Sequence, residues 1–397
     1  MTPTVSKNTY YRLYVSEIEY GVFIYHRFVI YSYIHSMSHA LAFRSRISPV
    51  FTSSWKSPIS PMIQSWPHTL SRRVDIHSHT TASDGIYTSD QVVRHARDRW
   101  IEILATTDHD IVTHETRDLA KACGIESYLG AEVSVDEWGK HLHILAYTDE
   151  DFDPDFYALL ERTRSGRSEK VDAQCRALGA RGYRISIPDD RFDHFGSSVV
   201  PLLHRMELFS LEALRRRYSN TNPENLNNVH IAKALYEVSG NRKKLREDTG
   251  DHSIDSTHKI ISLCLRSQGK YASILGQDRE IPRYEPTIAE LQWALGGTRS
   301  LLSLAHPQCT FDTFSWAQAF LDRTASIWGI EIASTAWEVW TRSLMRYARD
   351  TWRIMTFGSD FHGEKNPTHG NLWDMNTHVT SGVIERHVDM FRRRIWA

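Results

Sequence analysis

The chain has 397 residues, 41% of them hydrophobic, and a formal net charge of −1 at pH 7. This length suits one large domain or two smaller ones, and a charge so close to zero gives no general reason to expect binding to nucleic acid or to an anionic membrane. The four cysteines are far apart and form no Cys-x-x-Cys pair, so we expect reduced thiols and neither disulfides nor zinc ligands.

Residues 1–72 are predicted to form a poorly ordered or targeting-like extension. From Tyr20 to Val74 there is no acidic residue, whereas serine, arginine and aromatic residues are frequent. Transit peptides and loosely ordered termini both show this bias. The run GVFIYHRFVIYSYI contains His26 and Arg27 and is too short for a membrane span. We therefore expect no membrane partner and a cytoplasmic location, with a mitochondrial location as the alternative.

Residues 73–150 and 287–397 show short apolar runs that alternate with amphipathic stretches of helical period. The runs are RVDI, IEILATT, SYLGAEVS, HLHILAYT, RSLLSLA, IWGIEIAS and RIMTFGS. Between the first runs, SDQVVRHARDRW predicts a helix capped by Ser89 or Asp90, and HETRDLAKACG predicts a helix that ends near Gly124. Strands that alternate with helices predict an α/β fold with a largely parallel core.

Residues 151–286 depart from this alternation and are predicted to form an inserted helical subdomain. YALLERTRSGRSEKVDAQCRALG predicts one long or broken helix, and NLNNVHIAKALYEVSG predicts another that Gly240 closes. The charged run NRKKLREDTGDHSIDST predicts a solvated loop. The irregular stretch from Ser239 to Arg279 leaves open whether this part covers a substrate.

Histidines and acidic residues lie at or near the C-terminal end of nearly every predicted strand. They are His77, His79, Asp108, His109, Asp110, Glu132, His143, His306, Glu331, Asp360 and His362. In a barrel of parallel strands these ends converge on the face that carries the active site. Imidazole and carboxylate without thiolate suit Zn, Mn or Fe(II), and there are too many donors for one ion. Two or three cations bridged by a carboxylate would provide hydroxide near neutral pH and hold phosphoryl oxygens.

Six motifs in this order resemble the PHP family, the polymerase and histidinol phosphatase superfamily of metal-dependent phosphoesterases. They are DIHSHTTASDG, TTDHD, GAEVS, HLHILAY, LAHP and GSDFHG, and they extend from Asp75 to Gly363. VHIAKALYE and YEPTIAEL are similar to the branch that hydrolyses 3′,5′-nucleoside bisphosphates, 5′-nucleotides and short 5′-phosphorylated RNA. The resemblance implies a distorted (β/α)7 barrel with a small helical insertion.

The resemblance also implies nine ligands for three divalent metals. The first ion would be held by His77, His79, Glu132 and Asp360. Glu132 would bridge to a second ion, held also by His143 and His230, and the third would be held by Asp84, His109 and His362. His230 lies in the insertion, and Val229 stands where related proteins often have proline, so a surface histidine near a helix start is the alternative for His230.

Several further residues are candidates for catalysis or substrate binding. Glu132, His306 and Asp108 are the catalytic candidates, and His306 would either contact phosphate or hold the barrel mouth. Asp108 and Asp110 would orient metal-bound imidazoles, whereas Glu331 would support the barrel interior. Arg164 and Arg167 would form a fork for phosphate or a solvated helix face. Tyr271, Trp293 and Trp316 would stack on a base or pack in the core.

The predicted function is hydrolysis of phosphomonoesters of small nucleotides by a metal-bridging hydroxide, with Mn, Fe or Zn as cofactors. A histidinol-phosphate-type phosphatase is one alternative with a different substrate. Exonuclease action on short RNA is a second alternative, although the near-neutral charge argues against long nucleic acid. A PHP-type scaffold without activity is a third.

Overall fold

The computed structural model describes residues 72–188, 204–266, 268–277, 284–363 and 378–396. These parts contain two large hydrophobic cores, a smaller third one around the helices α2 (Ser89–Asp98) and α3 (His114–Ala122), and three sheets. The extension predicted for residues 1–72 lies outside the described residues, apart from Arg72. Within the described parts, no helix combines the length and the apolar character that crossing a membrane requires.

The first sheet is parallel and has the strand order β1 (Val74–Asp75), β2 (Ile103–Leu104), β3 (Glu126–Ser127). Helices α2 and α3 connect these strands. The cap of α2 is Thr88, one residue before the predicted Ser89, because its side chain forms a reciprocal capping box with Gln91. Gly124 follows the end of α3 with φ 77°, as the sequence predicts.

The second sheet has the strand order β10-β9-β8-β5-β4. Its strands are β4 (Leu129–Glu137), β5 (Lys140–Thr148), β8 (Leu301–Leu304), β9 (Gly329–Ala333) and β10 (Ile354–Gly358). Strands β8, β9 and β10 are parallel, but β5 runs antiparallel to both β4 and β8. The prediction of a largely parallel core is wrong here, because only Trp138 and Gly139, both with positive φ, separate β4 from β5. A two-residue turn of this kind closes a hairpin and leaves no room for a crossover helix.

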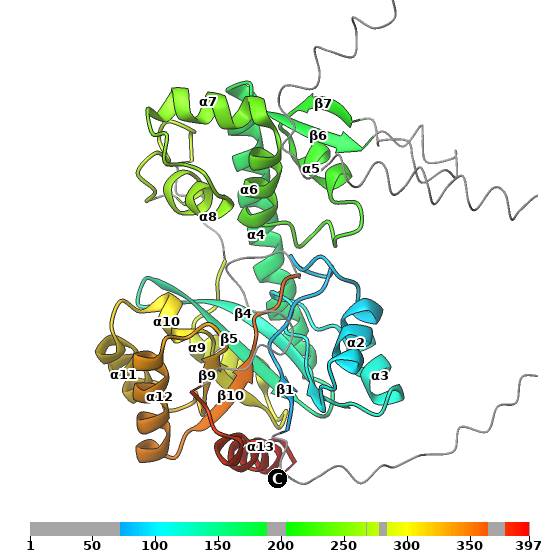
Figure 1. The fold of residues 1–397 in the computed structure, drawn as a ribbon, viewed down its shortest axis with the longest axis vertical. Helices are drawn as coiled ribbons and strands as arrows, with labels where there is room; N and C mark the ends of the chain where they lie inside the picture. Colours follow the sequence, from blue (N-terminus) through cyan, green and yellow to red (C-terminus); the bar gives the residue numbers. More distant parts are fainter. Residues whose placement is uncertain (1–71, 189–203, 267, 278–283, 364–377, 397) are drawn as a thin grey trace, which may run out of the picture. The chain divides into compact units, whose positions relative to one another are not determined.

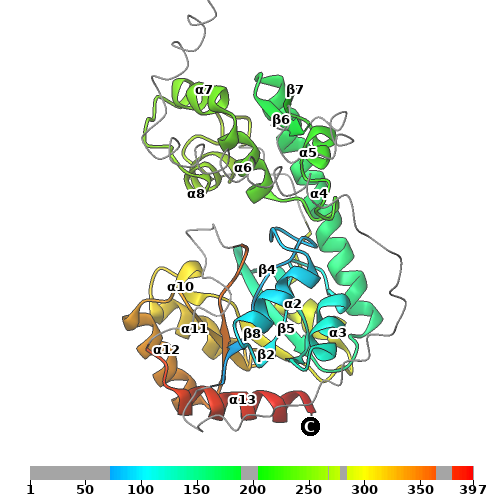
Figure 2. The same cartoon turned by 45° about the vertical axis from the view of Figure 1, so that its right-hand side comes forward.

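The two sheets approach each other at two isolated bridges, Ser78↔Phe361 and His109↔Glu132. The described strands form a mixed α/β fold and no closed sheet. Further helices are α9 (Ile288–Leu295), α10 (Pro307–Thr310), α11 (Phe314–Arg323), α12 (Glu338–Thr351) and α13 (Ser381–Trp396), and Figure 1 and Figure 2 show α12 and α13 beside β9 and β10.

A second core lies within residues 171–275. Its elements are β6 (Arg184–Pro188), β7 (His204–Leu208), α5 (Leu211–Arg217), α6 (Asn228–Glu237), α7 (Ser239–Thr249), α8 (Thr257–Ile260) and a π-helical turn (Ile261–Leu265). The long helix α4 (Pro154–Ala180) is continuous and contributes to both cores, with Phe156 and Leu160 in the first and Cys175 and Leu178 in the second.

Two predictions for this region are wrong. The first part of the charged run predicted as a loop, residues 241–249, lies in α7, because Leu245 is buried and Lys244 pairs with Asp248, four residues along the helix. Residues 250–256 connect α7 to α8 without helical structure, as the sequence predicts. Gly240 does not close α6 but lies inside α7, which ends before the left-handed Gly250. The insertion also contains an antiparallel strand pair, β6 and β7, which the helical pattern did not predict.

Candidate metal centre

The donors converge because buried contacts hold the ends of β1 and β10 together. Asp75 is fully buried at the end of β1, and its carboxylate accepts hydrogen bonds from the backbone N–H of Ser359 at 3.1 Å and from its hydroxyl at 2.6 Å. The backbone N–H of Asp360 also donates to the carbonyl of His77 at 2.9 Å. These bonds place His77 from the first sheet directly beside Asp360 from the second.

The first donor group consists of His77, His79, Glu132 and Asp360, whose donor atoms all lie within 4.8 Å of one another. His79 Nε2 lies 3.2 Å from both Glu132 Oε2 and Asp360 Oδ1. His77 Nε2 lies 3.5 Å from Glu132 Oε2 and 3.4 Å from Asp360 Oδ1. Two imidazoles and two carboxylates around one small volume are a donor set for a single divalent cation.

Two further groups share residues with the first. One contains His79, Asp84, His109 and His362, and the other contains His109, Glu132 and His143. His362 Nε2 lies 3.1 Å from Asp84 Oδ1, and His143 Nδ1 lies 2.9 Å from Glu132 Oε1. His79, His109 and Glu132 each belong to two groups. The structure thus brings eight of the nine predicted ligands together in overlapping sets.

The carboxylates provide an independent test of whether cations fit. Asp84 Oδ1 and Glu132 Oε2 are buried, and among the described residues they have imidazole nitrogens nearby but no hydrogen-bond partner of acceptable geometry. A buried anionic oxygen is costly unless a charge or a donor compensates it. A divalent cation among these oxygens and the neighbouring imidazole nitrogens would satisfy that requirement, so the residues fit such a group.

Burial and neighbouring charges shift the pKa values in this cluster. Burial opposes ionisation of Asp84 and Glu132, but the imidazoles around them hold both pKa values well below the usual range. Burial also disfavours charged imidazoles and lowers the pKa of His109 well below its usual value. For His79, burial disfavours the charged form, but the neighbouring carboxylates of Asp360 and Glu132 outweigh burial and raise the pKa to about 10. Cations must therefore displace protons from part of this cluster.

Glu331 and Gly358 fix the orientation of His77. Glu331 Oε1 lies 2.7 Å from His77 Nδ1, and Glu331 Oε2 accepts a 2.7 Å hydrogen bond from the backbone N–H of His306. A Cβ atom at Gly358 would lie 2.2 Å from the Cβ of His77 and 2.6 Å from Glu331 Oε1. Glu331 thus leaves His77 Nε2 facing the first donor group, which is how an outer carboxylate orients a ligating histidine.

Asp108 and Asp110 support the loops around the cluster. Asp108 accepts four hydrogen bonds, from Thr80 N and Oγ1, Ser83 Oγ and Thr113 Oγ1, all between 2.6 and 2.7 Å. Ser83 Oγ in turn lies 3.3 Å from His79 Nδ1. Asp110 accepts from the backbone N–H of Ser134 at 2.7 Å. Asp108 therefore acts on the cluster through the loop that carries His79 and Asp84.

His306 lies against the bridging carboxylate. Its Nε2 is 2.9 Å from Glu132 Oε1 and its Nδ1 is buried without a partner. Its backbone has φ 25°, a value that is strained for any residue except glycine. Strain of this kind is concentrated at functional sites, and here it keeps the imidazole beside Glu132 and His143.

His230 is buried at the start of α6 and belongs to none of the three donor groups, so the alternative of a surface histidine is wrong. Its ring lies 4.8 Å from the ring of Tyr218, and burial lowers its pKa to about 3. The neighbouring Asn227 donates from Nδ2 to Asp84 Oδ2 at 3.0 Å. The start of α6 therefore contacts the cluster directly through Asn227.

The two arginines that were predicted to form a fork for phosphate contact other parts of the protein. Arg167 is buried and pairs with Asp110, so it is not part of a solvated face. Arg164 is half-buried and donates from Nη1 to the carbonyl of Asp110 at 2.6 Å. Arg167 also donates to Asn225 Oδ1, and Asn225 Nδ2 donates to the carbonyl of His109 at 2.7 Å. Both guanidinium groups are thus engaged with the loop after β2.

Sequence reasoning missed Asn225 and Asn227. Both lie in the run NPENLNNVH before α6, where the sequence signal was only that of a helix cap. The three aromatic candidates differ from one another. Tyr271 is buried in the second core, with its hydroxyl 2.7 Å from Asp251, whereas Trp293 and Trp316 are 74% and 66% exposed and do not pack in a core.

The chain is similar to three curated bacterial proteins, although no family model matches it. It is 31% identical over 104 residues to a 5′-3′ exoribonuclease of Haemophilus influenzae, which covers 26% of this chain and 38% of that protein. It is 36% identical over 112 residues to a 3′,5′-nucleoside bisphosphate phosphatase of Chromobacterium violaceum, covering 28% and 39%. It is 34% identical over 117 residues to a phosphoribosyl 1,2-cyclic phosphate 1,2-diphosphodiesterase of Eggerthella lenta, covering 28% and 45%. These matches span less than half the length of each relative.

Two solved structures share the fold. A proposed metal-dependent phosphoesterase of Bifidobacterium adolescentis superposes with a TM-score of 0.56 at 19% identity, over 82% of this chain and 97% of the other. An amidohydrolase of Chromobacterium violaceum with bound sulfate and no metal superposes with a TM-score of 0.59 at 20% identity, over 80% and 96%. Taken with the sequence matches, these likenesses confirm the resemblance to a PHP-type phosphoesterase branch.

Proposed function

We propose that this protein is a metal-dependent phosphoesterase that hydrolyses phosphomonoesters of small nucleotides. The observation that carries the proposal is the overlap of three donor groups through His79, His109 and Glu132. Separate sites for structural metals would not need shared ligands, whereas cations that act together on one phosphoryl group do. Cations bound there would supply a nucleophilic hydroxide near neutral pH and neutralise charge on the phosphoryl oxygens.

The nine predicted ligands would hold three cations, with Mn, Fe and Zn as the candidates for donors of this type. Eight of these residues already form the three groups, and we propose His230 as an additional ligand that the insertion brings to Glu132 and His143. Asp108 and Asp110 would hold the loops in place, and Arg164 and Arg167 would contribute positive charge beside them.

We assign His306 a direct role with the substrate. Burial disfavours its charged form, but the hydrogen bond to Glu132 raises its pKa above the usual value. A charged imidazole carries protons on both nitrogens. Its Nε2 would face Glu132, and its Nδ1, which has no partner among the described residues, would donate to a phosphoryl oxygen or to the leaving oxygen.

The proposal extends to the parts of the fold that remain predictions. The two isolated bridges between the sheets support a distorted (β/α)7 barrel. The separate core of residues 171–275 supports an inserted subdomain over residues 151–286. The barrel would then be formed by residues 73–150 and 287–397. We propose a cytoplasmic location. A mitochondrial location is the alternative, because the stretch from Tyr20 to Val74 has no acidic residue, as is typical of transit peptides.

The test is phosphate release from adenosine 3′,5′-bisphosphate, AMP and histidinol phosphate, with Mn, Fe(II) or Zn added. We expect turnover of a nucleotide, and Glu132→Gln should abolish it because the substitution removes a negative charge from the shared ligand. His141→Gln is the matched control, since His141 lies two residues from His143 but contacts Glu285, at 3.0 Å, and belongs to no donor group. Activity on no nucleotide would refute the proposed substrate class.

A second candidate function is 5′-3′ exonuclease action on short RNA, because two relatives are named 5′-3′ exoribonucleases. A 5′-phosphorylated oligonucleotide separates the two functions. Shortening of the oligonucleotide from its 5′ end, with mononucleotides left intact, would favour the exonuclease. An inactive scaffold would release neither phosphate nor nucleotides from any of these substrates.

A further inference from the structure

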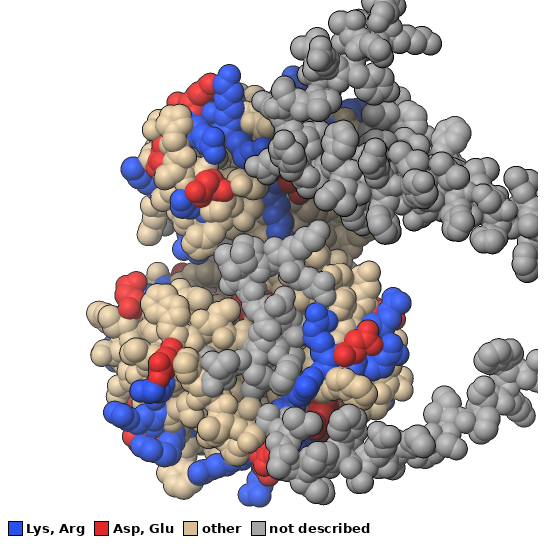
Figure 3. All heavy atoms as spheres, viewed as in Figure 1, with Lys and Arg blue, Asp and Glu red and all other residues tan. Residues whose placement is uncertain are grey.

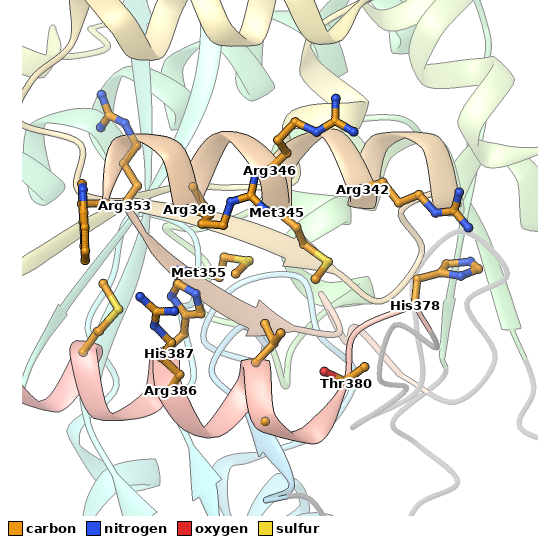
Figure 4. A pocket seen from close by; sticks show the side chains of 15 residues that line it. Arg342, Met345, Arg346, Arg349, Arg353, Met355, His378, Thr380, Arg386 and His387 are labelled. Atoms are coloured by element: carbon orange, nitrogen blue, oxygen red, sulfur yellow. Dashed lines mark hydrogen bonds between the residues drawn. The ribbon is translucent and has the colours of Figure 1, made fainter.

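Two neighbouring pockets that share no lining residue with the donor groups are lined by arginines and tryptophans. The first, of about 590 Å³, lies between α12 and α13 and is lined by five arginines, as Figure 4 shows. The second, of about 600 Å³, is lined by three further arginines together with Trp328 and Trp352. Trp352 and Met390 line both pockets, so the two adjoin each other, and we call them together the α13 groove.

Charge in the α13 groove is one-sided. None of the described residues that line either pocket is acidic, although the whole chain has a net charge of only −1. In Figure 3, basic side chains gather over the region where Figure 1 draws α12 and α13. A local basic surface on a neutral protein attracts anions even where the total charge does not.

Several of these arginines have no acidic partner in the described structure. Arg342 and Arg349 pair with Glu338 and Asp350, and Arg353 donates to backbone carbonyls. By contrast, no carboxylate lies within ion-pair distance of four others among the described residues. They are Arg346, Arg386, Arg393 and Arg394. The groove therefore offers guanidinium groups whose hydrogen-bond capacity is available to a ligand.

The aromatic residues of the groove are exposed to an unusual degree. Trp352 is 70% exposed and stands at the C-cap of α12 with a left-handed backbone, φ 58°. Trp328 is 45% exposed, and the guanidinium of Arg394 lies 5.1 Å from its ring centroid. Large indole rings held at a surface next to arginines provide stacking faces beside phosphate-binding groups.

The part of the groove that carries the tryptophans lies at the opposite end of the strands from the donor groups. Trp328 and Arg353 directly precede β9 and β10, whereas Asp360 follows β10. The five residues of β10 separate these ends by roughly 16 Å. Arg342, near the start of α12, lines the other end of the groove, as Figure 4 shows. A single nucleotide bound among the donor groups therefore does not reach the tryptophans.

We propose that the α13 groove binds single-stranded nucleic acid. Phosphates would contact the unpaired arginines, and unstacked bases would lie on Trp352 and Trp328. A single strand fits better than a duplex because its bases are free to stack on side chains. A single strand of nucleic acid also fits better than an acidic peptide, because carboxylate side chains have no aromatic face to stack on the tryptophans. Two adjoining pockets, each of the size of an ordinary small-ligand site, also exceed what one nucleotide needs.

The test is fluorescence anisotropy with a short single-stranded oligothymidine that carries a 3′ dye and a 5′-hydroxyl end. We expect binding that weakens as the KCl concentration rises. The double variant Arg346→Glu/Arg386→Glu should bind about tenfold more weakly or worse, and the slope of log affinity against log salt should shrink by about 1.4, or about 0.7 for each lost phosphate contact. Trp352→Ala should weaken binding at least about fivefold through lost stacking.

The matched control is Arg97→Glu/Lys121→Glu, an equal change of charge on the exposed faces of α2 and α3. We expect it to retain wild-type affinity. Thermal melting checks that each variant is folded, and Trp352→Ala serves alone if the double variant does not fold. Wild-type affinity in both groove variants, or equally effective competition by polyglutamate, would overturn the proposal. The assay measures binding without turnover, so a chain without phosphatase activity can still satisfy it and an active phosphatase can still fail it.

Discussion

Removal of the Asp108 carboxylate should loosen the loop that carries His79 and Asp84. Asp108 is fully buried and accepts four hydrogen bonds, from Thr80 N and Oγ1, Ser83 Oγ and Thr113 Oγ1. In Asp108→Ala the three hydroxyls can turn toward other acceptors, but the backbone N–H of Thr80 cannot. An unsatisfied buried donor costs about 1–3 kcal/mol, and each lost bond to a charged acceptor costs about 1 kcal/mol or more.

These contributions sum to a loss of roughly 4–6 kcal/mol in the free energy of unfolding for Asp108→Ala. Asp108→Asn should lose only roughly 1–2 kcal/mol, because its Oδ1 keeps the bonds from Thr80 N and Ser83 Oγ while its amide faces two hydroxyls that can turn to accept. The difference of roughly 2–5 kcal/mol should place the melting temperature of the alanine variant about 4–20 °C below that of the asparagine variant.

Differential scanning calorimetry and urea titration measure both variants, and metal analysis of the purified chains measures the effect on the cluster. We expect the alanine variant to bind metal about 10–100-fold more weakly, as is typical when a group that supports metal ligands is lost. Asp118→Ala, at an exposed position on α3, is the control. Equal stability of the alanine and asparagine variants would show that Asp108 does not hold the loop as described.

Three further outcomes follow from the structure. Burial lowers the pKa of His387 from 6.5 to about 4, and its Nδ1 accepts from the backbone N–H of Met355 at 3.1 Å. As the pH falls, His387 therefore takes up a proton in the unfolded chain before it does so in the folded one. The free energy of unfolding should fall by up to about 3 kcal/mol between pH 6.5 and pH 4, and it should fall less in the variant His387→Leu. Urea titration at several pH values measures both. Divalent metal binding at pH 7 should release about two protons, from His77 and His79, whose pKa values are raised, and calorimetry in buffers of different ionisation enthalpy should detect them. Gly358→Ala should cost about 1–3 kcal/mol and reduce metal content because its Cβ meets His77, whereas Gly297→Ala, where nothing lies within 4 Å, should be neutral in thermal melting.

The sequence predicted the site best where histidines and acidic residues recur at the ends of successive strands. The alternation of apolar runs with helices, and the polar residues after each run, were enough to place His77, His109 and Asp360 on one face. Strand direction was not encoded in that alternation. The hairpin between β4 and β5 depends on the left-handed backbone of Trp138, and a tryptophan gives no recognisable turn signal.

The register of the strand pairing explains why Glu132 and His143 still lie at the face that carries the other donors. In the antiparallel pair, Ser134 lies opposite His143 and Glu132 lies opposite Leu145. Ile144 lies opposite both Val133 of β4 and Leu304, the last residue of β8. Glu132 and His143, each one residue before this level in its own strand, therefore lie near the end of the sheet where the parallel strand β8 finishes. A histidine inside an antiparallel strand can therefore lie at the level where the parallel strands end, although the sequence pattern places metal ligands only at or after strand ends.

Polar contacts from the insertion complete the cluster in a way that residue spacing could not predict. Asn227 donates to Asp84, Asn225 donates to the carbonyl of His109, and Arg167 pairs with Asp110. Asn227 contacts the carboxylate of a predicted ligand, whereas the other two contacts are made to the loop that carries His109, and none of the three engages an imidazole nitrogen. Because a buried ion pair or hydrogen bond fixes geometry more than it adds stability, these contacts hold the donors at fixed separations while leaving the imidazole nitrogen atoms available. In the proposed enzyme these three residues would consequently help to set the spacing of the cations.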